Sequence, residues 1–308
     1  MACIKETIGR HSLPIYFVLA FAITWSGLLA TGGLSGLSAA TWQTDPLLPL
    51  MVVAMLAGPS AAGLLLMGVV SGRAGFSELL SRLLRWRVAP RWYAFALLTA
   101  PAVFTVVHMS LSLVSPDFRP TVITMSDPAS LLWSSIGGAL AVGFFEELGW
   151  TGFATPRLRR RYSAIVTALI VGVPWGGWHL LTNDVWIATT YRGDLPVATF
   201  VILNGIGLVV GQLPAYRVLM VWVYDRTGSL LIAMLMHASL SACTFILGPE
   251  KLTGAALIAY GFTLTVTWWT VVAAAALVMR YTASEHNLHK LSEQLFQRNH
   301  GQQQWRER

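Results

Sequence analysis

Charged residues are scarce in this sequence. They make up 11% of its 308 residues, against about 25% in an ordinary soluble domain, whereas 55% of the residues are hydrophobic. A chain with so little charge and with long uncharged runs predicts an integral membrane protein rather than a soluble one. Cysteine is also rare. Cys3 and Cys243 are far apart in the sequence and indicate no disulfide framework.

Long hydrophobic runs are abundant instead. A helix of about 20 apolar residues crosses the roughly 30 Å of hydrocarbon in a bilayer. We therefore expect an all-α fold, a polytopic membrane helical bundle with about eight transmembrane helices. The predicted spans are 14–34, 48–70, 92–113, 129–153, 163–182, 197–221, 229–247 and 255–279. They predict one helical domain over 1–280, with its motif-bearing core at about 129–247, followed by a polar cytoplasmic tail over 281–308.

The basic residues predict the orientation of these helices. With the N-terminus inside, 18 of the 21 Lys and Arg residues fall in cytoplasmic segments, and only Arg119, Arg192 and Lys251 fall outside. This bias predicts that both termini are cytoplasmic in a multi-pass protein of the cell membrane. It also accounts for the net charge of +7 without a nucleic-acid partner, and the predicted surroundings are the lipid bilayer.

One predicted cytoplasmic segment has helical periodicity. Residues 75–93 place Phe76 and Leu80 on an apolar stripe, with Arg82 and Arg85 between the apolar positions. A stretch of this kind is expected to lie along the anionic inner leaflet, as a connector at the membrane surface.

An ionisable side chain at the bilayer centre costs at least about 2.5–3.5 kcal/mol on insertion scales. Ionisable residues within the predicted spans are therefore candidates for a functional or structural role. Such residues are Glu146, Glu147, His179, His237 and His108. His108 stands alone and is interpreted as a hydrogen-bonded packing histidine. Arg217 is close to the end of its predicted span and is expected to snorkel to the interface.

Glutamate and two histidines can activate water by two routes. Glu146 can act as a general base while His179 and His237 orient the attack and stabilise an oxyanion. Alternatively, the same three side chains can hold a divalent metal such as zinc, whose bound water is then the nucleophile. Acids and histidines within the membrane also build proton or ion pathways in transporters, and they form purely structural pairs. The residues alone leave these interpretations open.

Three segments resemble the CPBP (Abi) family, the CAAX-protease and bacteriocin-processing intramembrane endopeptidases. The first motif, Glu-Glu-x-x-x-Arg, is similar to Glu146 through Thr151. The second, Phe-x-x-x-His, appears with tryptophan as Trp175 to His179. The third, His-x-x-x-Asn, reads His237 to Ser241. Two positions depart from the pattern, because Thr151 stands in the place of the arginine and Ser241 in that of the asparagine.

The resemblance implies an intramembrane peptidase that cuts membrane-associated peptides or proteins, in CAAX-type processing or in bacteriocin maturation or immunity. It implies that Glu146 and His179 activate water and that His237 and Ser241 stabilise the oxyanion. The expected catalytic residues are Glu146, Glu147, His179, His237 and Ser241, and the expected substrate-binding residues are Trp175, Trp178 and Thr151. The alternatives are a proton- or ion-coupled transporter and an inactive family member that acts as a membrane scaffold.

A single site makes a geometric prediction. The heads of Glu146, His179 and His237 should converge around one water-sized space, in a polar cavity open to the cytoplasm or to the inner leaflet. Adjacent helical residues point about 100° apart, so Glu147 should face another donor, such as an arginine. The predicted spans conflict with this, because they put His179 about 24 Å up its helix, far above the other groups. Either the span boundaries are wrong, or Pro174 and its neighbouring glycines break the helix.

Overall fold

The computed structural model describes residues 2–33, 46–249 and 252–278, and these residues form helices and no strand. The predicted tail 281–308 lies outside them. Eight helices are long and apolar enough to cross a membrane, which confirms the predicted all-α bundle. The spans are Ser12–Gly32, Leu48–Leu83, Pro90–Ser112, Pro128–Arg159, Ala164–Thr189, Val197–Thr227, Leu230–Leu247 and Gly254–Val278.

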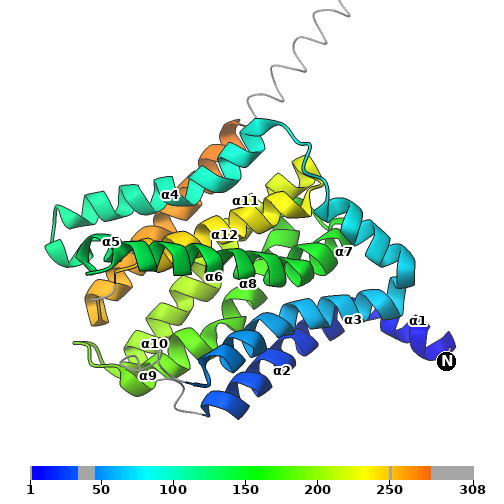
Figure 1. The fold of residues 1–308 in the computed structure, drawn as a ribbon, viewed down its shortest axis with the longest axis horizontal. Coiled ribbons are helices and arrows are strands. Elements are labelled where there is room, and N and C mark those ends of the chain that lie inside the picture. Colours follow the sequence, from blue (N-terminus) through cyan, green and yellow to red (C-terminus); the bar gives the residue numbers. More distant parts are fainter. Residues whose placement is uncertain (1, 34–45, 250–251, 279–308) are drawn as a thin grey trace, which may run out of the picture. The chain divides into compact units, whose positions relative to one another are not determined.

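Figure 1 shows the helices, coloured in the order of the chain. The α-helices are α1 (Ala2–Arg10), α2 (Ser12–Gly32), α3 (Leu48–Leu83), α4 (Pro90–Ser112), α5 (Thr121–Thr124), α6 (Pro128–Gly149), α7 (Thr155–Arg159), α8 (Ala164–Trp178), α9 (Trp186–Thr190), α10 (Val197–Ile206), α11 (Leu213–Thr227) and α12 (Leu230–Leu247). The chain divides into two units, Met1–Trp268 and Trp269–Arg308. Everything below concerns the first unit.

Three of the spans that end later than predicted contain a π-helical turn. These turns are η3 (Trp150–Ala154), η4 (Leu181–Val185) and η5 (Gly207–Gln212). The span that carries Glu146 therefore ends at Arg159, which puts Glu146 about 20 Å from that end at 1.5 Å per residue. α8 is continuous through Pro174. The conflict over the height of His179 thus comes from the predicted boundaries and not from a broken helix.

The helices that carry the predicted site residues begin with side-chain caps. The backbone N–H of Ser130 donates to Asp127 Oδ1 at the start of α6, and Ser163 and Ser229 accept in the same way at the starts of α8 and α12. Each cap satisfies a backbone donor that the first helical turn leaves unpaired. The starts of these three helices are therefore fixed locally.

Glycines let the central helices approach closely. A methyl group on Gly143 of α6 would lie 2.4 Å from the carbonyl oxygen of Met234, and one on Gly172 of α8 would lie 2.7 Å from Cα of Pro214. Small residues at such crossings bring helix backbones together in membrane bundles. α6 therefore packs directly on α12, and α8 on α11, as the central helices of Figure 1 show.

α3 is kinked at Gly72, whose φ of 57° and ψ of −144° suit glycine. The helical segment after the kink contains Phe76 and Leu80, both exposed, in agreement with the predicted amphipathic stripe. Arg82 differs from the expectation of a lipid-facing arginine. It is buried and donates to the hydroxyl of Tyr224 at 3.0 Å.

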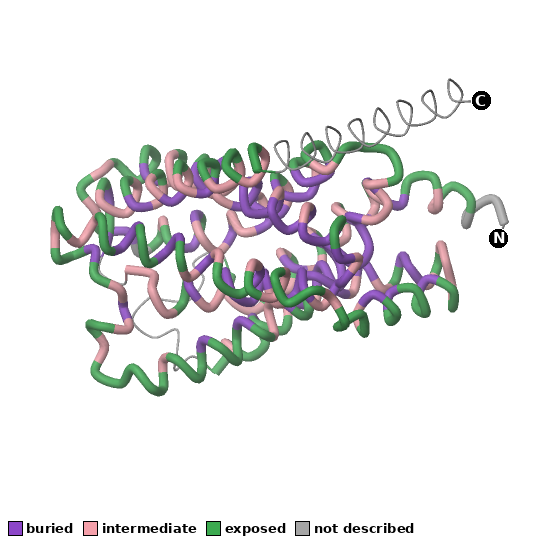
Figure 2. Tube along the Cα trace, turned by 90° about the horizontal axis from the view of Figure 1, so that it is seen from above, coloured by how far each residue is buried: buried purple, intermediate pink, exposed green. Residues whose placement is uncertain are grey.

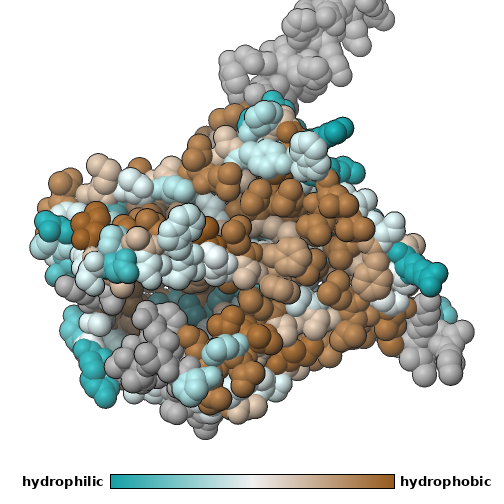
Figure 3. All heavy atoms as spheres, in the orientation of Figure 1, coloured by the Kyte–Doolittle hydropathy of each residue, from teal (hydrophilic) through white to brown (hydrophobic). Residues whose placement is uncertain are grey.

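Burial in this unit follows the pattern of a membrane bundle. Figure 2 shows buried residues along the inner faces of the helices and exposed residues along the outer faces. The face drawn in Figure 3 is largely apolar, with hydrophilic residues gathered toward its edges. Exposed apolar side chains are unfavourable in water but favourable against the hydrocarbon of a bilayer.

His108 is a packing residue, as its isolation in the sequence indicated. Its ring is buried, Nδ1 is 2.7 Å from the carbonyl oxygen of Phe118, and Nε2 is 3.0 Å from the hydroxyl of Tyr260. Both ring nitrogens are therefore used within the protein.

Candidate active site

Glu146 lies near the end of α6 and is held by two tryptophans. The indole N–H of Trp175 donates to Glu146 Oε2 at 2.9 Å, and that of Trp150 donates to the same oxygen at 3.3 Å. The residue is 1% exposed. Oε1 accepts no hydrogen bond from any residue that the structure describes, so this oxygen is available to a further donor such as water.

Glu147 points to a different partner. Arg217 of α11 donates to both carboxylate oxygens, at 2.8 Å to Oε2 and 3.0 Å to Oε1, and both side chains are fully buried. The hydroxyl of Thr151 also donates to Glu147 Oε2 and accepts from Arg217 at 3.4 Å. Thr151, an expected substrate-binding residue, thus lies against the ion pair and is buried.

His237 connects the two glutamates. Its Nδ1 is 2.7 Å from Glu147 Oε1, and its Nε2 is 4.0 Å from Glu146 Oε2. A carboxylate paired with a guanidinium only accepts hydrogen bonds, so the proton of this contact belongs on Nδ1. Nε2 therefore faces Glu146 across a gap that is too long for a direct hydrogen bond.

His179 follows α8 directly and is held by its own helix. Nδ1 lies 2.8 Å from the carbonyl oxygen of Trp175, an acceptor, so Nδ1 is the donor, and Nε2 makes no hydrogen bond to a residue that the structure describes. The Trp175 ring lies 6.0 Å from the His179 ring and 4.9 Å from the His237 ring, between centroids. The edge of Trp178 packs on His179 at 4.7 Å. Trp175 therefore joins the two histidines and Glu146 into one cluster.

Ser241 lies one turn beyond His237 on α12. It is half-buried, and its hydroxyl makes no hydrogen bond to another described residue. Its position on the helix face of His237 follows from the four-residue spacing.

The metal alternative requires several ligands around one point. Over residues 2–33, 46–249 and 252–278, no three His, Cys, Asp or Glu side chains are close enough together to share a metal ion. Glu147 engages His237 Nδ1 and a backbone carbonyl engages His179 Nδ1, so Nε2 is the nitrogen of each ring that these contacts leave unused. The chemistry below is derived from the side chains themselves.

The cluster is closed, in contrast to the open polar cavity predicted from the sequence. Glu146, Glu147 and His237 are at most 2% exposed, and His179 is the one of the four that is half-buried rather than buried. Two cavities of about 570 and 450 Å³ lie elsewhere, and neither is lined by any of these residues. Neither of these two cavities leads a peptide to Glu146.

Arg217 is the residue that the sequence analysis misjudged. It was expected to snorkel from a helix end, but it is fully buried, and α11 continues for ten more residues to Thr227. The left-handed Gly228, with φ of 60°, ends the helix. A glycine after the last helical residue is a common stop signal and would have moved the predicted boundary from 221 to 227.

Fold and site together define a class: a multi-pass helical membrane protein with a buried cluster of two glutamates, two histidines and an arginine, contributed by several helices. Comparison with known proteins is more specific. Residues 128–243 match the family model described as type II CAAX prenyl endopeptidase, Rce1-like. The family resemblance predicted from the three motifs is thereby confirmed.

A curated relative supports the same assignment. The chain is 26% identical over 98 residues to CAAX prenyl protease 2 of Methanococcus maripaludis. The match covers 32% of this chain and 35% of that protein. The matched part is thus about a third of the length of that relative.

Proposed function

We propose that this protein is an intramembrane endopeptidase of the cell membrane that hydrolyses a peptide bond in membrane-associated substrates, in CAAX-type or bacteriocin-type processing. One observation carries the proposal: the Glu146 carboxylate and His237 Nε2 face each other at 4.0 Å beside Trp175. The gap is too long for a hydrogen bond between them, and a water that bonds to both groups can bridge it.

In the proposed reaction Glu146 is the general base and His179 its partner. Glu146 takes a proton from the bridging water, and the resulting hydroxide adds to the carbonyl carbon of the scissile peptide. Collapse of the tetrahedral intermediate breaks the C–N bond, and the proton held by Glu146 passes to the leaving amine. A positioned base of this kind contributes about 10²–10⁴-fold to the rate.

The oxyanion of the intermediate requires donors, and His237 is the proposed one. In this role His237 acts as an imidazolium: Nδ1–H donates to Glu147, and Nε2–H points toward the space beside Glu146. Ser241 supplies a second hydroxyl donor on the same helix face. Oxyanion donors are each worth about 10²–10³-fold in kcat.

Glu147, Arg217 and Thr151 are proposed to act as positioning residues. Their side-chain hydrogen bonds are made to one another and to His237. Glu147 fixes the His237 ring through Nδ1, and Arg217 fixes Glu147 with two hydrogen bonds. Arg217 also lies over the Trp175 ring, 4.1 Å from its centroid. It therefore contacts Trp175 directly and holds His237 through Glu147. Trp175 and Trp178 are the proposed residues on the substrate side, next to the half-buried His179.

A product assay with the purified full-length protein tests this proposal. Detergent-solubilised protein is incubated with a membrane-anchored peptide library, and products are mapped by mass spectrometry. The expected result is cleavage at defined bonds that Glu146→Gln abolishes. Proton-coupled flux in liposomes without any cleavage product would favour the transporter alternative. Neither cleavage nor flux, from a stably folded protein, would favour the scaffold. Repeating the cleavage assay with a chelator separates side-chain chemistry from metal chemistry.

A further inference from the structure

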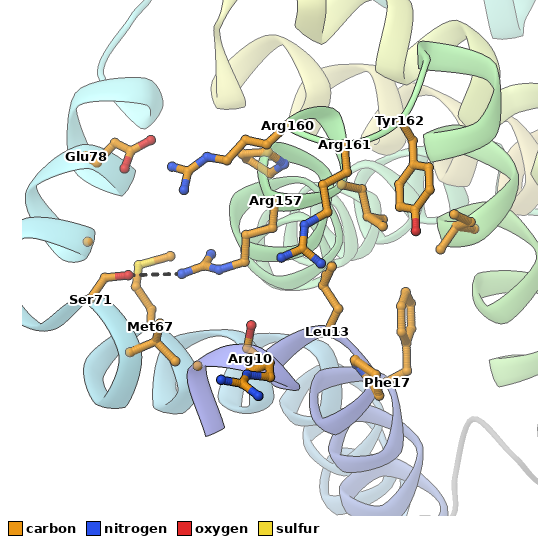
Figure 4. A pocket seen from close by; sticks show the side chains of 18 of the residues that line it. Arg10, Leu13, Phe17, Met67, Ser71, Glu78, Arg157, Arg160, Arg161 and Tyr162 are labelled. Atoms are coloured by element: carbon orange, nitrogen blue, oxygen red, sulfur yellow. Dashed lines mark hydrogen bonds between the residues drawn. The ribbon is translucent and has the colours of Figure 1, made fainter. Parts of the chain in front are cut away.

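The larger cavity, of about 570 Å³, lies away from the candidate active site. It is formed where the start of α2, the kinked part of α3 and the segment from Pro156 to Tyr162 meet (Figure 4). Its size falls within the roughly 300–1,000 Å³ that is typical of small-molecule sites. The kink at Gly72 matters here, because it turns the second half of α3 away from its first half.

Arginines dominate the polar lining of this cavity. The five arginines are Arg10, Arg82, Arg157, Arg160 and Arg161, and the one lining acid is Glu78. Glu78 is already paired with Arg82 at 3.8 Å, and Arg82 also donates to Tyr224. The cavity therefore keeps a positive charge that the protein does not compensate.

Arg157 is built into the wall. Its guanidinium donates to the carbonyl oxygen of Phe153 at 3.0 Å and to the hydroxyl of Ser71 at 3.1 Å, and it lies 3.7 Å from the centroid of the Phe153 ring. Figure 4 shows it spanning from its own helix toward α3. The positive-inside bias accounts for basic residues in this segment, but it does not require one to be half-buried and held in place.

Arg160 and Arg161 are the uncommitted charges. Both are exposed, and neither guanidinium makes a hydrogen bond or ion pair with another residue in the described part of the chain. Arg10 pairs with Glu6 at 3.7 Å, but both side chains are more than 70% exposed, where such a pair is worth little. Guanidinium groups bind phosphate oxygens in bidentate fashion, and several of them around one cavity favour a phosphate group.

Apolar side chains form much of the remaining wall. They include Leu13, Phe17, Met67, Val70, Leu158 and Ile170. An inorganic ion gains no contact from an apolar wall. An amphiphile can place its charged head against the arginines and its apolar chain against this wall. Basic pockets between membrane helices on the cytoplasmic side are the usual binding sites of anionic lipid headgroups.

We propose that this cavity binds the phosphate headgroup of an anionic membrane lipid, with Arg157, Arg160 and Arg161 as its ligands and the apolar wall against the start of the acyl chains. The proposal does not depend on the hydrolytic reaction, so the two stand or fall separately.

Titration of the full-length protein in neutral detergent with short-chain phosphatidylglycerol, followed by calorimetry, tests the proposal. The probes for comparison are short-chain phosphatidylcholine, which has no net charge, and inorganic phosphate. We expect saturable binding of the anionic lipid alone. Inorganic phosphate that binds as tightly as the lipid, or competes with it fully, would make this a free-phosphate site and overturn the lipid assignment. Equal binding of phosphatidylcholine would overturn the role of the charge.

The matched variants are Arg160→Gln/Arg161→Gln and Arg87→Gln/Arg91→Gln. Both pairs are exposed and remove two charges, but only the first lines the cavity. We expect about 30-fold weaker lipid binding for the first pair, as about 1 kcal/mol per arginine implies, and unchanged binding for the second. Equal weakening by the two pairs would show a diffuse charge effect and end the proposal. Since Arg160 and Arg161 hold nothing in the fold, thermal unfolding should be unaffected.

Discussion

Arg217 and Glu147 form a buried bidentate ion pair across 70 positions of the chain, with N–O distances of 2.8 and 3.0 Å. The pair explains a departure from the Glu-Glu-x-x-x-Arg motif. Thr151 stands where the motif has arginine, and a threonine cannot compensate a carboxylate. Here the positive charge comes from a different helix, α11, and Thr151 supplies one hydrogen bond to the same carboxylate. The carboxylate of Glu147 is therefore still paired with an arginine, although the arginine of the motif is absent.

The first prediction concerns the proposed base. Glu146→Gln should reduce peptide cleavage by about 10²-fold or more, because an amide cannot take a proton from water. The fold should be retained, since the amide oxygen still accepts from Trp150 and Trp175. Cleavage rate and thermal unfolding are the two measurements. Glu6→Gln, on an exposed glutamate, is the control and should change neither. Full activity of the Glu146 variant would remove this residue from the mechanism.

The second prediction concerns the buried ion pair. Removing one partner of such a pair leaves an uncompensated charge and typically costs about 3–5 kcal/mol. Arg217→Met and Glu147→Leu should each destabilise the protein strongly. The double variant should recover much of that loss, because both charges are then gone. Unfolding of all three variants in one detergent measures this. A double variant as unstable as the sum of the singles would contradict the pairing.

A further variant of Glu147 separates a positioning role from a role in substrate binding. Glu147→Gln keeps the shape of the side chain and its contacts to His237 and Thr151, but loses the charge that orients the His237 ring. We expect kcat to fall with little change in KM, since neither group contacts the substrate in the proposed reaction. A change in KM alone would mean that Glu147 contributes to substrate binding instead.

The third prediction concerns the approach of α6 to α12. A methyl group on Gly143 would lie 2.4 Å from the carbonyl oxygen of Met234, and one on Gly137 of the same helix would meet nothing within 4 Å. Gly143→Ala should therefore separate Glu146 from His237, reducing cleavage and costing about 1–3 kcal/mol of stability, as overpacking does. Gly137→Ala is the control and should be neutral or slightly stabilising. Equal effects would show that helix propensity and not packing is responsible.

The sequence was sufficient for the number of spans, because a run of about 20 apolar residues has few other uses. It was also sufficient for the two glutamates and two histidines, because ionisable groups are rare in such runs. It was not sufficient for the helix ends. Two spans run past the ends that periodicity predicts, to Arg159 and Thr227. These boundary errors made Arg217 a terminal residue and put Glu146 too near the end of its helix to meet His179.

The contacts of the site depend on tertiary structure. Nothing near Thr151 in the sequence indicates that its missing charge comes from Arg217, since the two positions meet only once η3, which follows α6, lies against α11. The closed state of the cluster is likewise a result of packing: Trp150, Trp175 and Trp178 are at most 1% exposed and surround Glu146 and His179. A sequence motif identifies the residues of such a site, but it does not show whether substrate can reach them.

The last prediction tests the orientation that the basic residues indicate. Single cysteines are introduced at Arg87 and Asp117, which are exposed on either side of α4, after both native cysteines are replaced by serine. A membrane-impermeant maleimide added to intact cells should label Asp117→Cys and should reach Arg87→Cys only after the cells are broken. The reason is the 18-to-3 bias of basic residues. The arginine-lined cavity would then face the cytoplasm, where anionic headgroups of the inner leaflet can reach it. Labelling of position 87 in intact cells would invert the topology and place that cavity on the outer side.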